Sequence, residues 1–152
     1  MIVYRICRAK YTDFLSGEGA RLSGGRWNSV GTPMIYTSGS RALCILELWA
    51  NYGSDLVPKD FVWVEMEIPK TLKIDRVLLT KAPPDWQSFP HPNSTKEIGD
   101  QFVLGNKKLV LEVPSSLVPQ EHNFLINPTH LDVKKIKILK SEPLQMDLRL
   151  IQ

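Results

Sequence analysis

A series of short, strand-like segments most constrains how this chain can fold. In residues 61–68 apolar side chains alternate with Trp63 and two glutamates, which is the period of a half-buried strand, and Pro69 ends the pattern. Residues 2–7 and 109–113 are further apolar segments of strand length, and a proline also ends the second. The sequence therefore predicts a fold built mainly from β-strands.

Three more segments are predicted as strands, at residues 34–38, 72–79 and 133–139. In the last of these, lysines alternate with Ile136 and Ile138. This alternation is typical of an edge strand whose charges discourage aggregation, and we favour that interpretation over a nucleic-acid-binding patch.

Two helices are predicted, well separated in the chain. The first spans about residues 41–52, and Ser38 or Ser40 can cap its start. The second begins at a capping-box pattern in residues 94–97 and ends near Gly105. Because strands outnumber helices, the predicted class is α+β, with a bent, mainly antiparallel sheet or pair of sheets.

Two long connections interrupt these elements. Residues 17–32 contain five glycines and few apolar side chains, which predicts a long loop of the kind that is usually functional or disordered. Residues 83–92 contain four prolines and cannot sustain regular strand pairing. In this second loop Trp86, Phe89 and His91 either border a pocket or a partner, or fix the loop to the core.

Composition limits the class of protein. A chain of 152 residues with 43% hydrophobic content suits a single domain with its own core. Its net charge of +3 is too small for a dedicated nucleic-acid-binding surface. Two cysteines provide no disulfide framework, and no signal peptide or membrane-length apolar segment is recognisable. We therefore expect a soluble, cytoplasmic protein.

Glu47 is the charge that most needs an explanation. It is the single charged residue of residues 42–50, in the first predicted helix. A carboxylate buried there needs a partner or a chemical role. Since a helix buries only part of its circumference, Glu47 could instead emerge at the surface, and the residue pattern favours function only slightly.

Other candidate residues are ordinary when each is taken alone. Arg26, between glycines and Trp27, is either a solvated cation or a bidentate phosphate ligand. Tyr36 suits a core position, and Ser115 or Ser116 suits a turn after a proline. The three histidines show no metal-ligand spacing, so no metal site is predicted.

Taken in order, several short motifs resemble the RES domain family over nearly the whole chain. They are Tyr4-Arg5, Gly25-Arg26-Trp27-Asn28, Ile35-Tyr36-Thr37-Ser38, Ala42-Leu43-Cys44-Ile45-Leu46-Glu47, Val113-Pro114-Ser115 and Asn123-Phe124-Leu125-Ile126-Asn127-Pro128. The Arg, Glu and Ser that name this family match Arg26, Glu47 and most simply Ser115, with Ser116 as the alternative. Cys44 departs from the family, in which alanine is more frequent.

The resemblance implies a fold related to the ADP-ribosyltransferase toxins, with a few helices around an NAD cleft. It implies the toxin of a bacterial toxin–antitoxin pair, whose antitoxin carries an Xre-like helix-turn-helix domain and covers the active site. Members cleave the nicotinamide–ribose bond of NAD by hydrolysis or phosphorolysis, and another branch transfers ADP-ribose to a protein. A non-catalytic nucleic-acid-binding module is a weaker alternative, which rests on the lysines of residues 134–140.

The resemblance also implies roles for individual residues. Glu47 would stabilise the positive charge that develops on the ribose, and Ser115 would orient Glu47 or hold the nicotinamide end. Tyr36 would border the nicotinamide ribose. The residues implied to contact NAD are Arg5, Arg26, Trp27, Tyr36 and Asn123. Because nicotinamide leaves as a neutral group, the chemistry needs no metal.

Overall fold

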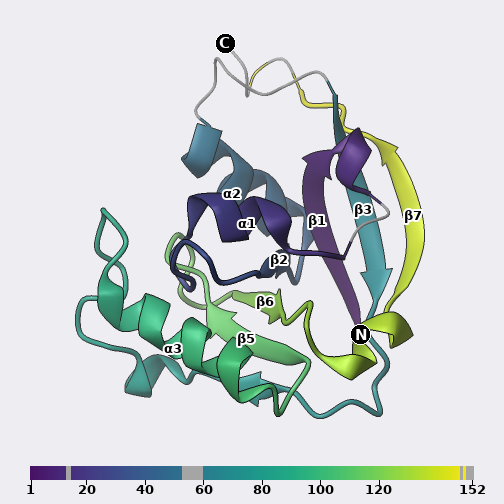
Figure 1. The fold of residues 1–152 in the computed structure, drawn as a ribbon. Helices are drawn as coiled ribbons and strands as arrows, with labels where there is room; N and C mark the ends of the chain where they lie inside the picture. The colour runs from purple at the N-terminus through teal and green to yellow at the C-terminus, as the bar shows by residue number, and fades with distance from the viewer. Residues whose placement is uncertain (13–14, 53–59, 148, 150–152) are drawn as a thin grey trace.

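The computed structural model describes residues 1–12, 15–52, 60–147 and 149, and its centre is a seven-stranded sheet of order β4-β5-β6-β2-β1-β3-β7 (Figure 1). The strands are β1 (Ile2–Arg8), β2 (Ile35–Ser38), β3 (Phe61–Glu67), β4 (Asp75–Arg76), β5 (Val110–Pro114), β6 (His122–Ile126) and β7 (Lys137–Pro143). Neighbouring strands are antiparallel except β4 and β5. The predicted α+β class with a mainly antiparallel sheet is confirmed, and the strands form one sheet.

Within the described residues, three α-helices accompany the sheet: α1 (Glu18–Ser23), α2 (Arg41–Tyr52) and α3 (Asn93–Gly105). Short 3-10 turns lie at Ala9–Tyr11, Leu79–Lys81 and Leu131–Lys135. Helix α2 packs against β1 and β2, whereas α3 lies along β5 at the other end of the sheet (Figure 1). The two long helices therefore cover different parts of the sheet. None of the described helices is long and apolar enough to span a bilayer.

Two apolar clusters form the core. The first includes Val3, Val64 and Met66 of the β1–β3 pair, and the second includes Trp27 and Trp86 beneath α3. Along β5, Val110 belongs to the first cluster and Leu111 and Val113 to the second, so this strand is buried on both faces. Four of the five residues 109–113 are apolar, as expected for a strand that is buried on both faces, and the fifth, Glu112, is paired with Arg76.

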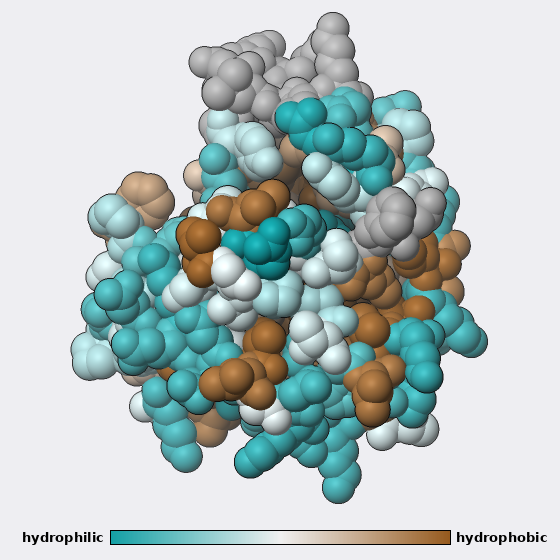
Figure 2. Space-filling view, viewed as in Figure 1, coloured by the Kyte–Doolittle hydropathy of each residue, from teal (hydrophilic) through white to brown (hydrophobic). Residues whose placement is uncertain are grey.

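The face of the molecule shown in Figure 2 is mainly hydrophilic and carries several apolar patches. One patch lies over α1, where Leu22 is 62% exposed (Figure 2). Val30, at 71% exposure, lies in the segment whose Gly31 N–H donates to the Arg21 carbonyl of the same helix. Apolar side chains are therefore exposed on α1 and on the segment that follows it.

Several sequence-based boundaries need correction. Residues 17–32 contain helix α1 and are not an uninterrupted loop. Within residues 72–79 only Asp75–Arg76 forms a strand, a 3-10 helix begins at Leu79, and Leu78 and Leu79 are 46% and 49% exposed. The lysine-rich strand is an edge strand as predicted, but it runs over Lys137–Pro143. Strand β6 was not predicted at all.

The two predicted helix starts had opposite outcomes. Ser40 caps α2, since its Oγ accepts a hydrogen bond from the Leu43 N–H at 3.1 Å. The capping box at 94–97 is wrong, because α3 begins at Asn93 and the Ser94 hydroxyl donates to Asp85 instead. Gly53, a residue suited to end α2, lies outside the described residues.

Candidate active site

A cavity of about 250 Å³ lies among α2, β1, β2 and β6. These four elements come from three separate parts of the sequence and meet because β2 lies between β1 and β6 in the sheet. The polar part of the cavity lining includes Arg5, Tyr36, Ser38, Glu47, Asn51 and Asn123.

Glu47 lies in the middle of α2 and points into this cavity, not to the outer surface. Its Oε1 accepts two hydrogen bonds, from Ser115 Oγ at 2.9 Å and from Asn123 Nδ2 at 2.6 Å. Hydrogen bonds to a charged acceptor are among the stronger ones in proteins. The carboxylate is therefore held in one orientation while it still faces the cavity.

Ser115 follows the end of β5 and is completely buried. Its Oγ accepts hydrogen bonds from the N–H groups of Leu117 and Val118, at 3.1 and 3.2 Å, and gives its own hydrogen to Glu47. Both lone pairs and the hydrogen of this hydroxyl are therefore engaged by groups of the protein. Of the two adjacent serines, Ser115 makes the contact.

Asn123 lies on β6 directly opposite Ser38 of β2. The Ser38 hydroxyl donates to Asn123 Oδ1 at 2.8 Å, and the amide group of the same side chain donates to Glu47. The pairing of β2 with β6 thus brings Ser38 and Asn123 together beside the carboxylate of Glu47. The sequence predicts Ser38 as a possible helix cap and as part of the Ile35-Tyr36-Thr37-Ser38 motif, whereas its pairing with Asn123 depends on strand β6, which was not predicted.

Tyr36 forms the wall of the cavity beside the glycine-rich loop. Its hydroxyl donates to Asn28 Oδ1 at 2.7 Å and accepts from the Trp27 N–H at 3.0 Å. Burial raises the pKa of this phenol above its ordinary value, so the hydroxyl remains protonated. A Cβ on Gly25 would lie 2.6 Å from the same hydroxyl, so a glycine is needed where the loop passes Tyr36.

Asn28 is the residue that ties this loop together. It is completely buried, and its Nδ2 donates to the carbonyls of Ala20 and Thr32 at 2.8 and 2.9 Å. With its Oδ1 bound to Tyr36, one side chain links α1, the loop and β2. Asn28 belongs to the Gly25-Arg26-Trp27-Asn28 motif, but these contacts are not evident from the sequence.

Arg5 and Arg26 have different surroundings. Arg5, on β1, lines the cavity, and no salt bridge or side-chain hydrogen bond to it occurs within the described part of the chain. Arg26 donates from Nη1 to the carbonyls of Trp86 and Ser88, and so holds the proline-rich loop. Burial lowers the pKa of Arg26, while the negative charge of Glu47 acts in the opposite direction.

Trp27 does not line the cavity. Its ring is 3% exposed and packs in the second core cluster with Trp86, so only its backbone N–H reaches the site, through Tyr36. Trp86 likewise fixes the proline-rich loop to the core, whereas Phe89 is 85% exposed and packs edge-on against His91. The interpretation that an aromatic residue fixes this loop to the core is confirmed for Trp86, and a pocket or partner at Phe89 and His91 stays a prediction.

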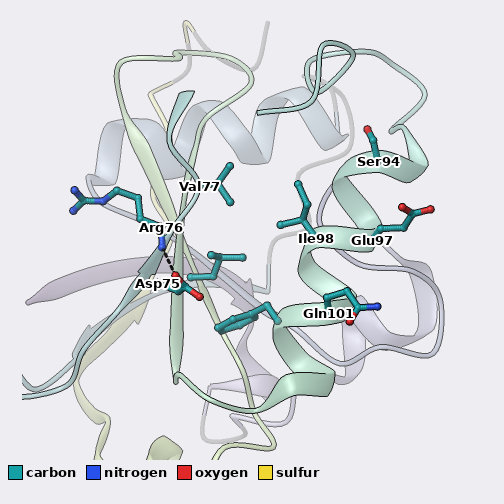
Figure 3. Close-up of a pocket in the computed structure, with 9 residues that line it drawn as sticks. Asp75, Arg76, Val77, Ser94, Glu97, Ile98 and Gln101 are labelled. Carbon is teal, nitrogen blue, oxygen red and sulfur yellow. Dashed lines mark hydrogen bonds between the residues drawn. The ribbon is translucent and has the colours of Figure 1, made fainter. Parts of the chain in front are cut away.

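A larger groove of about 540 Å³ lies between β4 and α3 (Figure 3). Val77 and Ile98 approach the space from opposite sides, and Glu97 and Gln101 lie along its α3 rim (Figure 3). None of the predicted site residues lines this groove. Its arginine, Arg76, is already paired, with Nη2 2.7 Å from Glu112 Oε2. We therefore assign the candidate site to the smaller cavity.

Within the described ranges, no cluster of three or more metal-ligating side chains occurs.

The chain matches a known protein family and several named proteins. The family model described as RES domain matches residues 2–147. A protein named Toxin Res from Photorhabdus laumondii is 36% identical over 154 residues, which cover 100% of this chain and 98% of that protein. The Prs ADP-ribosylating toxin of a Sphingobium species is 37% identical over 147 residues, covering 95% of this chain and 91% of the relative.

A solved structure shares the fold. It is the crystal structure of the M. tuberculosis MbcT–MbcA toxin–antitoxin complex, one chain of which matches with a TM-score of 0.74 and 19% identity. The match covers 94% of this chain and 83% of that chain.

Proposed function

This chain belongs to the RES domain family, and from that premise we propose that it is the toxin of a toxin–antitoxin pair. We propose that it depletes NAD by cleaving the bond between nicotinamide and ribose. The toxin names of its relatives support the first part. The second part rests on one observation, the carboxylate of Glu47 held by two donors at the wall of a polar cavity.

The proposed chemistry follows from the charge that develops during cleavage. As the C–N bond breaks, nicotinamide leaves as a neutral molecule and positive charge accumulates on the ribose carbon and ring oxygen. A fixed carboxylate beside that carbon stabilises the transition state more than the ground state. Water then adds to the ribose carbon and releases a proton, or phosphate adds in its place.

The two oxygens of Glu47 have different surroundings, and this suggests how substrate binds. Both donors contact Oε1, and within the described part of the chain no hydrogen-bond donor contacts Oε2. We assign Oε2 to a ribose hydroxyl of NAD, since a carboxylate oxygen without a partner is the available acceptor. Ser115 and Asn123 would then act by holding the carboxylate in place.

The arginines suit the pyrophosphate of NAD. Arg5 faces the cavity with no described salt-bridge partner. Arg26 binds the two loop carbonyls through Nη1 alone, so among the described contacts its Nε and Nη2 remain available for phosphate oxygens. The Tyr36 hydroxyl is already engaged on both sides, so we propose that its ring borders the nicotinamide ribose.

The size of the cavity supports partial enclosure of the dinucleotide. Its volume of about 250 Å³ lies below the roughly 300–1,000 Å³ of pockets that enclose a whole drug-sized ligand. We therefore propose that the nicotinamide–ribose half enters the cavity while the rest of NAD lies along its open side. The proposed reaction uses the protein's own charges and needs no metal.

We also propose an antitoxin partner with an Xre-like helix-turn-helix domain that covers this cavity. The related fold in a toxin–antitoxin complex supports a partner of that general kind. Co-expression with the adjacent reading frame, followed by joint purification, tests this proposal. The complex should release much less nicotinamide than the chain alone. A co-purified partner that leaves the activity unchanged would contradict the covering role.

Transfer of ADP-ribose to a protein is the second candidate, favoured by the name of the Sphingobium relative. The two candidates share the bond that breaks and differ in the acceptor. Purified protein should be incubated with NAD, with and without phosphate, and the nicotinamide and ADP-ribose products measured by chromatography. Nicotinamide release without any protein acceptor supports the first candidate. Binding of NAD without cleavage, together with labelling of an added protein, would overturn it in favour of transfer.

A further inference from the structure

A chain of hydrogen bonds reaches Glu47 from the sheet. The Ser38 hydroxyl donates to Asn123 Oδ1 at 2.8 Å, and Asn123 Nδ2 donates to Glu47 Oε1 at 2.6 Å. Ser38 is only 4% exposed, and it makes no direct hydrogen bond to Glu47. Any influence of this serine on the carboxylate must therefore pass through Asn123.

Ser38 can affect Glu47 because the two sides of the Asn123 carboxamide differ chemically. An asparagine side chain presents an acceptor on one side and donors on the other, and a turn of 180° exchanges them. With its oxygen bound to a hydroxyl hydrogen, Asn123 must present its NH₂ group to Glu47. Without that hydroxyl, Asn123 Oδ1 loses the hydrogen bond from Ser38, and the amide that donates to Glu47 is free to rotate away from its present geometry.

The other contact of the Asn123 side chain agrees with this direction of donation. Its Nδ2 is bound to Glu47 Oε1, so its Oδ1 is the atom that faces the Ser38 hydroxyl and accepts from it. Both β2 and β6 are fixed by the sheet, so the pair Ser38 and Asn123 is a rigid support.

We propose that Ser38 is a positioning residue for Glu47, which acts by fixing the orientation of the Asn123 amide. Ser115 holds Oε1 from the end of β5, and the Ser38–Asn123 pair holds it from β6. Two anchors from different strands leave the carboxylate little freedom to rotate. This inference rests on the proposed function, because it assigns Ser38 to the same carboxylate.

The test compares two serines that lie two residues apart. Ser38→Ala removes the support of Asn123, whereas Ser40→Ala removes the cap of α2, the helix that carries Glu47. We expect Ser38→Ala to lower kcat for nicotinamide release by about tenfold with KM nearly unchanged, as for one hydrogen bond that acts in the transition state. Ser40→Ala should lower stability and leave kcat within about twofold.

A double-mutant cycle separates positioning from general damage. In the Asn123→Ala background, Ser38→Ala should cause no further loss of kcat, because the amide through which it acts is absent. If the two losses multiply instead, or if Ser38→Ala alone matches the wild type, the proposal is overturned. Ser38→Thr retains the hydroxyl and should recover most of the activity.

A spectroscopic measurement keeps the inference testable if the chain does not cleave NAD. The Asn123 side-chain amide should give shifted, slowly exchanging proton resonances, identified by their absence in Asn123→Ala. These features should be lost in Ser38→Ala and kept in Ser40→Ala. Failure of nicotinamide release in the wild type would contradict the proposed function alone. Unchanged Asn123 resonances in Ser38→Ala would overturn the positioning role.

Discussion

Ser115 donates a hydrogen bond of 2.9 Å to Oε1 of Glu47, although the two residues are 68 positions apart in the sequence. One lies just beyond the end of β5 and the other on α2. Their contact converts two ordinary features, a serine after a proline and a glutamate in an apolar helix, into parts of one site.

Glu47→Gln should reduce nicotinamide release by more than about 100-fold, the scale expected when one stabilising group of a transition state is lost. Glutamine keeps an oxygen that can accept from Ser115 and Asn123, so the fold should remain and only the charge is lost. Chromatographic measurement of nicotinamide checks this. Glu97→Gln, an exposed change on α3, is the matched control. Equal activity of the two variants would refute the role of Glu47.

Ser115→Ala should lower kcat by about 10- to 100-fold and leave measurable activity, because the hydroxyl positions Glu47 without attacking the substrate. The free energy of unfolding should fall by ~1–3 kcal/mol, since two N–H groups lose their acceptor. Kinetics and urea denaturation check both effects. Ser116→Ala should be close to the wild type. Complete loss of activity in a folded Ser115→Ala protein would favour a direct chemical role instead.

The two arginines should respond differently to removal. Arg5→Ala should raise KM for NAD about tenfold or more and leave the fold unchanged, because it removes a cation from the cavity wall. Arg26→Ala should also release the proline-rich loop, which loses its anchor at the Trp86 and Ser88 carbonyls. Limited proteolysis distinguishes the two variants, because residues 83–92 should be cleaved faster in Arg26→Ala than in Arg5→Ala. Equal protection of the loop in both variants would show that Arg26 does not hold it.

Gly25→Ala should impair the site through Tyr36. The added Cβ would lie 2.6 Å from the Tyr36 hydroxyl, so the loop or the ring must move. We expect reduced nicotinamide release and a lower melting temperature. Gly19→Ala is the control, because a Cβ there meets no atom within 4 Å and favours helix α1. A Gly25→Ala protein as active as Gly19→Ala would contradict the tight approach.

Alkaline pH should destabilise the protein through Cys44. Burial raises the pKa of this thiol from 9.0 to about 12, so only the unfolded chain ionises between those values. The stabilising contribution is complete below pH 9 and is lost as pH rises toward 12. Urea denaturation across this range should show a shallower decline for Cys44→Ala than for the wild type. Parallel curves for the two proteins would mean that the thiol is not buried in solution.

Local patterns predicted most of the regular structure. Alternation in residues 61–68 predicted β3, the apolar run at 109–113 predicted β5, and Ser40 was one of two predicted caps for α2. Each of these signals is complete within a few neighbouring residues. Strand β6 was missed because it begins with polar residues and is buried where it pairs with β2 and β5, which no local pattern reveals.

The capping box at 94–97 failed for a related reason. The serine and glutamate have the right spacing, yet Ser94 is drawn to Asp85 of the preceding loop, and the helix starts earlier, at Asn93. A tertiary contact therefore overrode a local preference. Trp27 is a second example. The family resemblance implies that it contacts NAD, but its ring packs in the core.

The sequence by itself determined the fold class, helix α2 and strands β1, β2 and β5 at the site, and the family to which the chain belongs, but not strand β6. Only the tertiary structure decided that Glu47 faces a cavity, that Ser115 and Asn123 share its Oε1, and that Ser38 stands behind Asn123. Periodicity is encoded in neighbouring residues, so a sequence reveals it directly. The contacts to Glu47 span 68 and 76 residues and exist only because the strand order brings β5 and β6 to α2.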